Sequence, residues 1–328
     1  MRKLKLFAAI ALAVLGMFFV LNYGAIGEIS REILNVEDDS VLYKTCIDAK
    51  DDTAVSFPPE AMTVAETEQV QIPAASDDNI VPTTISGGLS IKNSTSYIIN
   101  VKEMLSEGCP IRLKEGKPQI LIIHTHSSEA YSPAGLDQYD DSGGNRTQDN
   151  NYNVIRIGDE LEKLLSDQGL KVIHDRGVYD YPSYTGSYSK CGEAISKYLE
   201  ENPSISIVID LHRDALGSDD VTYKTVATET GVCASQLMFV MGSDECGLEH
   251  PNWKGNLSLA LYLQNAVTAK YASLMRPVSL VGYRYNQHLS SGSLILEVGS
   301  NGNTIQEALA AIRLFADAAG PALLKLVE

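Results

Sequence analysis

The stretch that most constrains the fold is the continuous apolar run at residues 120–123, which leads directly into His124-Thr125-His126. A run that is apolar at every position predicts a strand buried on both faces. In open α/β sheets, functional side chains collect where such strands end. Glu129 follows His126 by three residues. The sequence therefore places imidazoles and a carboxylate where chemistry is expected.

Two later apolar runs end in the same way. Residues 204–211 lead into His212, and residues 293–296 lead into Glu297. If the sheet is largely parallel, the three strand ends open onto one edge. His126, Glu129 and His212 then offer two nitrogens and one oxygen to a zinc ion, which leaves Glu297 to activate a water molecule as the catalytic base.

The polar neighbours of these residues have more than one interpretation. His124 shares a face with His126 if the strand continues, so it orients the site from outside the ligand set, competes as a ligand or fills the core. Arg213 is a candidate catalytic residue that stabilises an oxyanion, or it forms an ion pair with Asp214. His174 has no partner at ligand spacing, and we expect it to be structural or exposed.

Strands and helices alternate along the rest of this region. The pattern predicts a helix at 154–165, with capping residues at 149–153 and a stop at Gly169, followed by a strand at 170–174. Further helices and strands are expected at 191–199, 237–242, 256–271, 294–298 and 305–326. We therefore expect an α/β fold with an open, largely parallel sheet and helices on both faces.

The N-terminal third of the chain has a different character. A basic flank at residues 1–5 precedes an apolar segment at 6–26, which predicts an uncleaved transmembrane anchor rather than a cleaved signal peptide. Residues 27–110 are acidic and contain Ser, Thr and Pro, as expected for an extracytoplasmic spacer. Residues 111–328 would form the catalytic domain of a single-pass cell-membrane protein, outside the cytoplasm.

Composition excludes some partners and leaves others open. The formal net charge of −16 and the pI near 4.8 argue against nucleic acid. Tyr181 and Tyr184 lie in a tyrosine-rich loop, and they line a substrate cleft or simply pin the loop. The cysteines show no zinc-ribbon spacing and support no disulfide assignment; they are Cys46, Cys109, Cys191, Cys233 and Cys246.

Three separated motifs, at residues 122–131, 210–215 and 286–301, resemble the stage II sporulation protein P family, and the resemblance covers about residues 111–325. That family comprises membrane-anchored cell-wall hydrolases of endospore formers, related to the zinc N-acetylmuramoyl-L-alanine amidases. The resemblance implies cleavage of the amide between N-acetylmuramic acid and the stem peptide in peptidoglycan, with or without cleavage of peptide cross-links. It also implies action in forespore engulfment with a lytic transglycosylase, stage II sporulation protein D.

One motif departs from the broader amidase pattern. Those amidases take a zinc ligand from a glutamate at the start of the first helix, and residues 149–153 contain none. The spacing of His126 and Glu129 is similar to that of zinc carboxypeptidases, so Glu129 is the expected second ligand and Asp149 the reserve. A carboxypeptidase-like peptidase acting on stem peptides and a non-enzymatic wall-binding module remain alternatives.

Overall fold

The computed structural model describes residues 83–86, 89–132, 145–218, 221–229 and 231–328. The expected basic flank and anchor, and most of the expected spacer, lie outside these ranges. Within them, no helix is both long enough and apolar enough to cross a bilayer.

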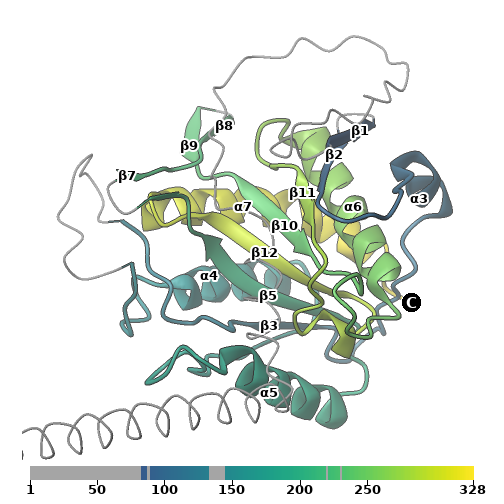
Figure 1. Ribbon diagram of the computed structural model, residues 1–328, viewed down its shortest axis with the longest axis horizontal. Coiled ribbons are helices and arrows are strands. Elements are labelled where there is room, and N and C mark those ends of the chain that lie inside the picture. The colour runs from purple at the N-terminus through teal and green to yellow at the C-terminus, as the bar shows by residue number, and fades with distance from the viewer. Residues whose placement is uncertain (1–82, 87–88, 133–144, 219–220, 230) are drawn as a thin grey trace, which may run out of the picture. The chain divides into compact units, whose positions relative to one another are not determined.

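An eight-stranded sheet forms the centre of the described chain, in the order β1-β2-β11-β10-β12-β5-β3-β4 (Figure 1). Its strands are β1 (Thr83–Ser86), β2 (Leu89–Asn93), β3 (Ile120–Ile123), β4 (Val172–His174), β5 (Ile207–Asp214), β10 (Leu237–Met241), β11 (Val278–Leu280) and β12 (Ser293–Ser300). Two small ribbons pair β6 (Gly217–Ser218) with β7 (Val221–Thr222), and β8 (Ala227–Glu229) with β9 (Val232–Ala234). The predicted α/β class is confirmed.

Most of the sheet is parallel, but two pairs of neighbouring strands are antiparallel: β1 with β2 at one margin, and β10 with β12 in the middle. Strands β12, β5, β3 and β4 run parallel to one another, whereas β10 pairs with β12 in the antiparallel sense. A parallel return usually needs a crossover helix. The described residues between β5 and β10 carry only the two ribbons, so β10 enters the sheet in the opposite direction. The sheet is therefore more mixed than the sequence predicts.

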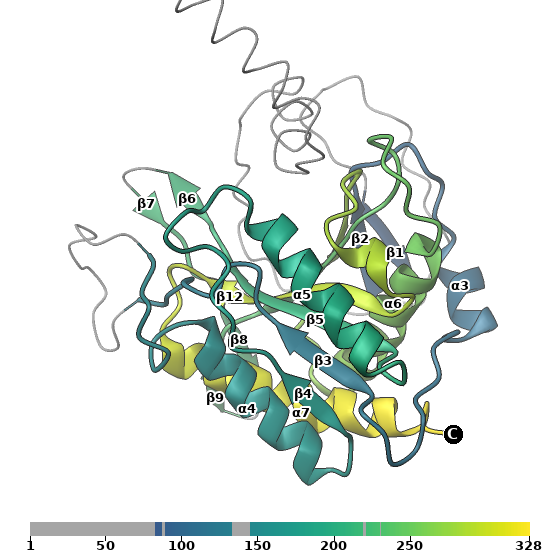
Figure 2. The ribbon, with the colours of Figure 1, turned by 90° about the horizontal axis from the view of Figure 1, so that it is seen from below.

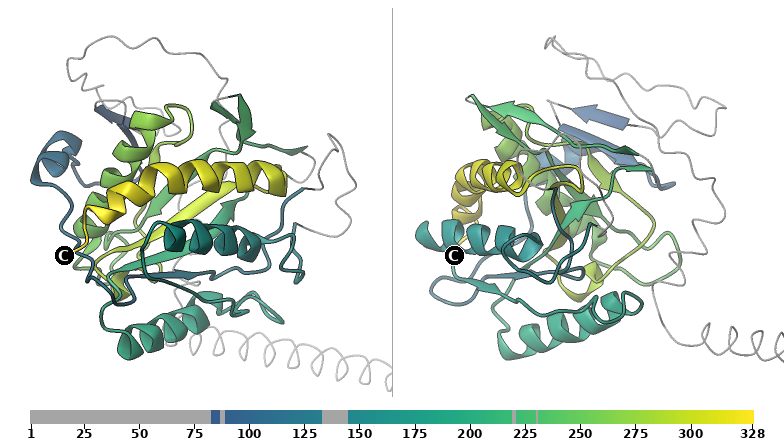
Figure 3. Two further views of the ribbon diagram at one scale, coloured as in Figure 1. Left: turned by 180° about the vertical axis from the view of Figure 1, so that it is seen from behind. Right: turned by 90° about the vertical axis from the view of Figure 1, so that its left-hand side faces the viewer.

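Helices cover both faces of the sheet, as predicted. Helices α4 (Val154–Asp167), α6 (Trp253–Lys270) and α7 (Ile305–Leu324) pack on one face, and α5 (Ser187–Glu201) packs on the other (Figures 2 and 3). The alternation of side chains along β3 explains this division. Ile120 and Ile122 belong to the core under α4, whereas Leu121 and Ile123 contact the core under α5.

The expected start of helix α4 is confirmed by its cap. The side chain of Asn153 accepts a hydrogen bond from the backbone N–H of Ile155 at 3.0 Å. Such a cap satisfies one of the N–H groups that a helix leaves without a partner.

The folded domain begins before residue 111, which corrects the expected spacer boundary. Strand β2 lies in the sheet and pairs with β11 in parallel register, with Ile91 opposite Val278. Leu89 and Ile91 are 1% and 0% exposed. Helix α3 (Val101–Glu107) also lies within the expected spacer. The described residues from 83 onward thus belong to one folded domain.

This boundary is open to a stability test. Ile91→Ala removes a fully buried side chain, so we expect the free energy of unfolding to fall by about 2–5 kcal/mol. Ile98→Ala is the matched control, because Ile98 is 96% exposed and its loss should change stability by no more than about 0.5 kcal/mol. Denaturant unfolding of the full-length chain measures both. Equal, small effects would place β2 outside the cooperative unit.

Candidate active site

The strand register brings the three motifs to one edge of the sheet. Ile123 at the end of β3 lies opposite Asp210 of β5, and His212 of β5 lies opposite Glu297 of β12. Because neighbouring parallel strands present opposed residues on the same face, His212 and Glu297 point to the same side. The predicted common edge is confirmed.

His126, Glu129 and His212 lie together at this edge, and all three are buried. Nδ1 of His212 is 3.4 Å from Oε2 of Glu129, and the rings of His126 and His212 are 5.4 Å apart at 80°. Nδ1 of His126 is enclosed and has no hydrogen-bond partner within the described residues. The group offers two imidazole nitrogens and one carboxylate, the donor set expected of a zinc ligand set.

The charges of these groups are strongly coupled. Burial lowers the pKa of His126 to about 4, with His212 adding to the effect, so its ring is neutral at pH 7. Burial is the largest influence on Glu129 and would raise its pKa, but the charge and hydrogen bond of His212, together with the charges of Arg213 and His126, outweigh burial and hold that pKa at about 2. Burial opposes protonation of His212, yet Asp210 and Glu129 raise its pKa well above the ordinary value. His126 and Glu129 are thus already in the neutral and ionised forms that bind a metal, whereas His212 must release a proton when a metal binds.

Glu297 is in a different electrostatic state. Its Oε2 is enclosed and has no hydrogen-bond partner in the described part of the chain. Burial raises the pKa of Glu297 to about 8, and the charge of His212 only partly opposes the rise. A carboxyl group whose Oε2 has no partner and whose pKa is strongly raised, in a site with other titratable groups, is a candidate for proton transfer.

Asp210 is a site residue that the sequence interpretation missed. Its Oδ1 lies 2.9 Å from Nε2 of His212. Thr125 donates to Asp210 from its backbone N–H at 2.8 Å and from its hydroxyl at 2.6 Å. A carboxylate behind an imidazole fixes the ring so that the other nitrogen faces the ligand. The signal was available, because residues two apart in a strand share a face.

His124 faces away from the ligand set. Its Nδ1 lies 2.8 Å from the carbonyl oxygen of Leu211, and its Nε2 lies 2.8 Å from Nε2 of His174. Both ring nitrogens are therefore engaged, which favours the buried orienting role over the competing-ligand role. The carbonyl group belongs to Leu211, the residue before His212, so His124 contacts the part of β5 that carries a candidate ligand.

Comparison with known proteins adds a family to this geometry. Residues 30–320 match the profile of stage II sporulation protein P. The chain belongs to the stage II sporulation protein P family. Stage II sporulation protein P of Bacillus subtilis (strain 168) is 26% identical over 216 residues, covering 61% of this chain and 50% of that protein. This family member thus spans about half the length of the curated relative, and the resemblance seen in the motifs is confirmed.

Solved structures of amidases are similar to part of this chain. N-acetylmuramoyl-L-alanine amidase AmiC2 of Nostoc punctiforme is 16% identical, with a TM-score of 0.39 over 64% of this chain and 97% of that one. The CwlD amidase from Clostridioides difficile, solved in complex with the GerS lipoprotein, is 14% identical, with a TM-score of 0.39 over 63% and 98% of the two chains.

In this family member, Asp149 lies in an exposed turn. Its Oδ1 accepts hydrogen bonds from the backbone N–H of Asn151 at 3.0 Å and from the Asn151 side chain at 2.8 Å. These contacts give Asp149 the role of a turn-forming residue. The geometry therefore favours Glu129, which is buried beside His212, as the second ligand.

The contacts of Arg213 differ from the expected ion pair with Asp214, and they favour a positioning role over the predicted stabilisation of an oxyanion. Its guanidinium donates to the carbonyl oxygens of Ala130 at 2.8 Å and Asn145 at 2.6 Å, so it is directed at the backbone rather than at an oxyanion. Asp214 forms its ion pair with Arg276 at 2.6 Å. The backbone N–H of Arg213 donates to Oε2 of Glu129 at 3.0 Å. Arg213 thus positions the loop and the carboxylate of Glu129.

The tyrosine loop reaches the site through one of its two candidate residues. The ring of Tyr184 stacks on His126 with centroids 4.4 Å apart at 9°, and the ring of Tyr188 meets His126 edge-on at 5.4 Å. Tyr184 is nevertheless 56% exposed, so much of it faces solvent. Tyr181 is equally exposed, and its place in a cleft stays a prediction.

A second missed group ties this loop to the first motif. The side chain of Asp180 is buried and accepts hydrogen bonds from the hydroxyls of Ser127 and Ser128. Arg146 pairs with Asp180 at 3.0 Å and lies over the ring of Tyr184 at 4.7 Å. Asp180 and Arg146 are distant in sequence from the motifs, so spacing gave no signal for them.

Asp210→Asn tests the support behind His212. Loss of a carboxylate partner of a metal-binding imidazole should weaken zinc affinity by about 10–100-fold. Asp149→Asn is the control, and we expect it to leave affinity unchanged because Asp149 lies in its exposed turn. Competition with a chelating dye measures both constants. An equal loss in Asp149→Asn would return Asp149 to the ligand set.

Proposed function

We propose that this chain is a zinc-dependent peptidoglycan hydrolase that cleaves the amide between N-acetylmuramic acid and the stem peptide during sporulation. The observation that carries the proposal is the convergence of His126, Glu129 and His212 beside Glu297, whose carboxylate is enclosed and whose pKa is raised to about 8. Family membership supports the sporulation context.

The residues present fit zinc. Nδ1 of His126 is a buried nitrogen without a hydrogen-bond partner in the described chain, and the low pKa of Glu129, about 2, keeps its carboxylate ionised. We assign His126, Glu129 and His212 as the ligands. A bound zinc would supply Lewis acidity, which polarises the scissile carbonyl and lowers the pKa of a water to ~7.

The protein's own groups would then move the protons and orient the ligands. Glu297 takes a proton from the attacking water and returns it to the leaving amine, and its raised pKa keeps the two transfers close in energy. Asp210 holds the imidazole of His212 by its Nε2. The exposed part of Tyr184 offers an aromatic surface for a sugar or peptide group next to His126.

A carboxypeptidase-like action on stem peptides is the second candidate, because one cation lies beside the site. Nη2 of Arg146 is 3.8 Å from Oε1 of Glu129, and its side chain is 39% exposed. A peptidase of that class needs a cationic group to hold a terminal carboxylate. Arg146 is also paired with the buried Asp180, however, which makes the amidase the better supported reaction.

The cellular setting belongs to the same proposal. A basic flank at 1–5 and an apolar segment at 6–26 would anchor the chain in the cell membrane with its catalytic domain outside the cytoplasm. The partner expected there is a lytic transglycosylase of the stage II sporulation protein D type, acting on the same peptidoglycan and linked to this chain by family resemblance.

Bond mapping separates the candidate functions. Purified peptidoglycan is treated with the full-length protein and zinc, and the products are identified by mass spectrometry. An amidase releases stem peptides with new L-alanine amino termini and leaves glycan free of peptide. New carboxyl termini within the stem would indicate the peptidase instead. Wall binding without any product would make the chain a binding module.

A further inference from the structure

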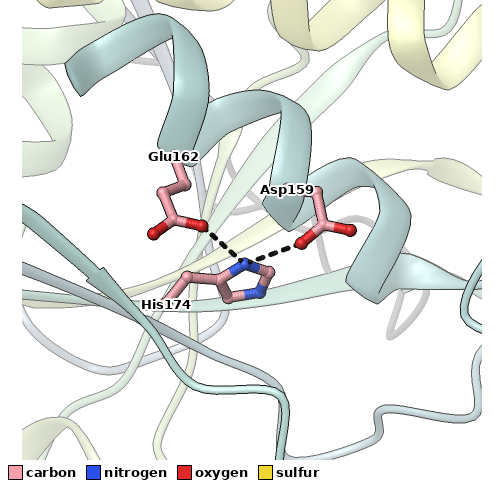
Figure 4. A group of neighbouring side chains, drawn as sticks. All are labelled: Asp159, Glu162 and His174. Atoms are coloured by element: carbon pink, nitrogen blue, oxygen red, sulfur yellow. Dashed lines mark ion pairs between the residues drawn. The ribbon is translucent and has the colours of Figure 1, made fainter.

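A second cluster of ligand-type side chains lies on the face of the sheet covered by α4. Asp159 and Glu162 project from α4 toward His174 at the end of β4 (Figure 4). Nδ1 of His174 is 3.3 Å from Oδ1 of Asp159 and 3.5 Å from Oε2 of Glu162. Among the His, Cys, Asp and Glu side chains of the described residues, these three form the group in which one potential ligand atom from each residue lies within 4.8 Å of the others.

The imidazole of His174 is fixed from behind. Nδ1 of His124 faces the carbonyl oxygen of Leu211, which can only accept, so that nitrogen carries the proton. Both rings are buried, which favours their neutral forms. Nε2 of His124 then has a lone pair, and Nε2 of His174, 2.8 Å away, must donate to it. Nδ1 of His174 is left with its own lone pair.

That lone pair points at two carboxylates. The side chain of His174 is 0% exposed, and its Nδ1 has no hydrogen-bond partner within the described chain. One nitrogen and two oxygens that all carry lone pairs are a set of atoms that a cation can bind.

Arg176 supplies positive charge to the two carboxylates from the solvent side. Its Nη2 lies 2.6 Å from Asp159 Oδ1 and 2.7 Å from Glu162 Oε2. The guanidinium leaves Nδ1 of His174 without a donor, and the Arg176 side chain is 46% exposed. It can therefore move into solvent when another cation enters.

Gly158 makes this arrangement of rings sterically possible. A Cβ at this position would lie 2.5 Å from Nε2 of His174 and 2.8 Å from Nε2 of His124, both closer than real contacts allow. The glycine on α4 therefore lets the two imidazoles lie against the helix next to Asp159. Close approach of backbone to a functional group is a common reason for glycine in a helix.

We propose that Asp159, Glu162 and His174 form a second divalent-cation site, which takes a borderline cation such as Zn²⁺ in place of the guanidinium of Arg176. One nitrogen and two carboxylates are ligands that zinc accepts. The site ties α4 to β4, and through His124 it reaches Leu211 beside His212. The inference does not depend on the proposed function, because none of its three ligands belongs to the hydrolytic site.

Zinc content measured by elemental analysis after equilibrium dialysis of the full-length chain tests this site. We expect two zinc ions per wild-type chain, and one in both His212→Ala and Asp159→Asn/Glu162→Gln. The control Asp167→Asn/Glu200→Gln changes two exposed carboxylates and should keep both ions. Occupancy unaffected by Asp159→Asn/Glu162→Gln would overturn the second site. If the wild-type chain holds one zinc ion and only Asp159→Asn/Glu162→Gln removes it, the second site is supported and the zinc proposed at the hydrolytic site is not.

Arg176→Gln provides an independent measurement if the double variant fails to fold. Removing the competing charge should tighten zinc binding at this site by about fivefold or more, as judged by competition titration in a His212→Ala background. The ¹⁵N resonance of His174 Nδ1 should shift on zinc addition. Unchanged affinity and an unmoved resonance would mean that the cluster is an ion pair only.

Discussion

Glu297→Gln should lower turnover of purified peptidoglycan by about 10²–10⁴-fold while zinc remains bound. Glutamine keeps the shape of the side chain and removes only the proton acceptor, and the three proposed ligands are untouched. Product release measured by mass spectrometry and zinc content measured on the same sample give the two readings. Loss of zinc would make Glu297 a ligand, and near-normal turnover would remove it from the chemistry.

The same substitution has a pH signature in the metal-free protein. The folded-state pKa of Glu297 is about 8, above its ordinary value of 4.5, so between these values the folded chain binds more protons than the unfolded chain. Its stability should therefore fall as pH rises through this window. Glu297→Gln removes that loss, which is at most about 1.4 kcal/mol for each unit of raised pKa. Glu200→Gln, on an exposed residue, should show no such difference.

Glu129→Ala should abolish hydrolysis and cost zinc affinity at least about 100-fold. Glu129 is buried between His212 and Arg146, and it is the carboxylate of the proposed ligand set. Its loss leaves only two imidazoles where a catalytic zinc site requires three protein ligands. Competition with a chelating dye measures the zinc affinity, and the rate of hydrolysis at saturating zinc shows whether the variant still catalyses the reaction.

The control for this experiment makes the same change in net charge but spares the ligand. Glu193→Ala removes an exposed glutamate from α5 and should change neither reading. Removal of Glu129 also strips a partner from His212, whose raised pKa should then fall. Full zinc retention with intact activity in Glu129→Ala would show that the proposed ligand set is wrong.

The buried strands could be predicted because burial on both faces leaves a continuous apolar run, as in 120–123. Strand β2 escaped notice because it alternates apolar and polar residues over only five positions, and β11 has three residues. The reversal at β10 is also absent from local sequence. Strand direction depends on the connection that precedes it, and the ribbons after β5 carry no helical pattern.

The site shows the same division between local and distant information. The spacing of His126 and Glu129 is local, and so is the relation of Asp210 to His212, although the latter was overlooked. Asp180 meets Ser128 across 52 residues of chain, and no periodicity links such positions. Arg213 lies beside a predicted ligand, and its hydrogen bonds to the backbone of Ala130 and Asn145, which sequence spacing could not reveal, favour a role in positioning the loop.

The hairpin of β1 and β2 has a mechanical consequence for a chain held from its N-terminal side. The hairpin occupies one margin of the sheet, and β11 and β10 separate it from the strands that carry His212 and Glu297. Tension applied ahead of Thr83 would load the pairing of β1 with β2 first, and then the pairing of β2 with β11, before it reached the strands that carry His212 and Glu297. Because β11 and β10 lie between the hairpin and these strands, the arrangement of His212 and Glu297 would persist under a force that separates the hairpin from the sheet.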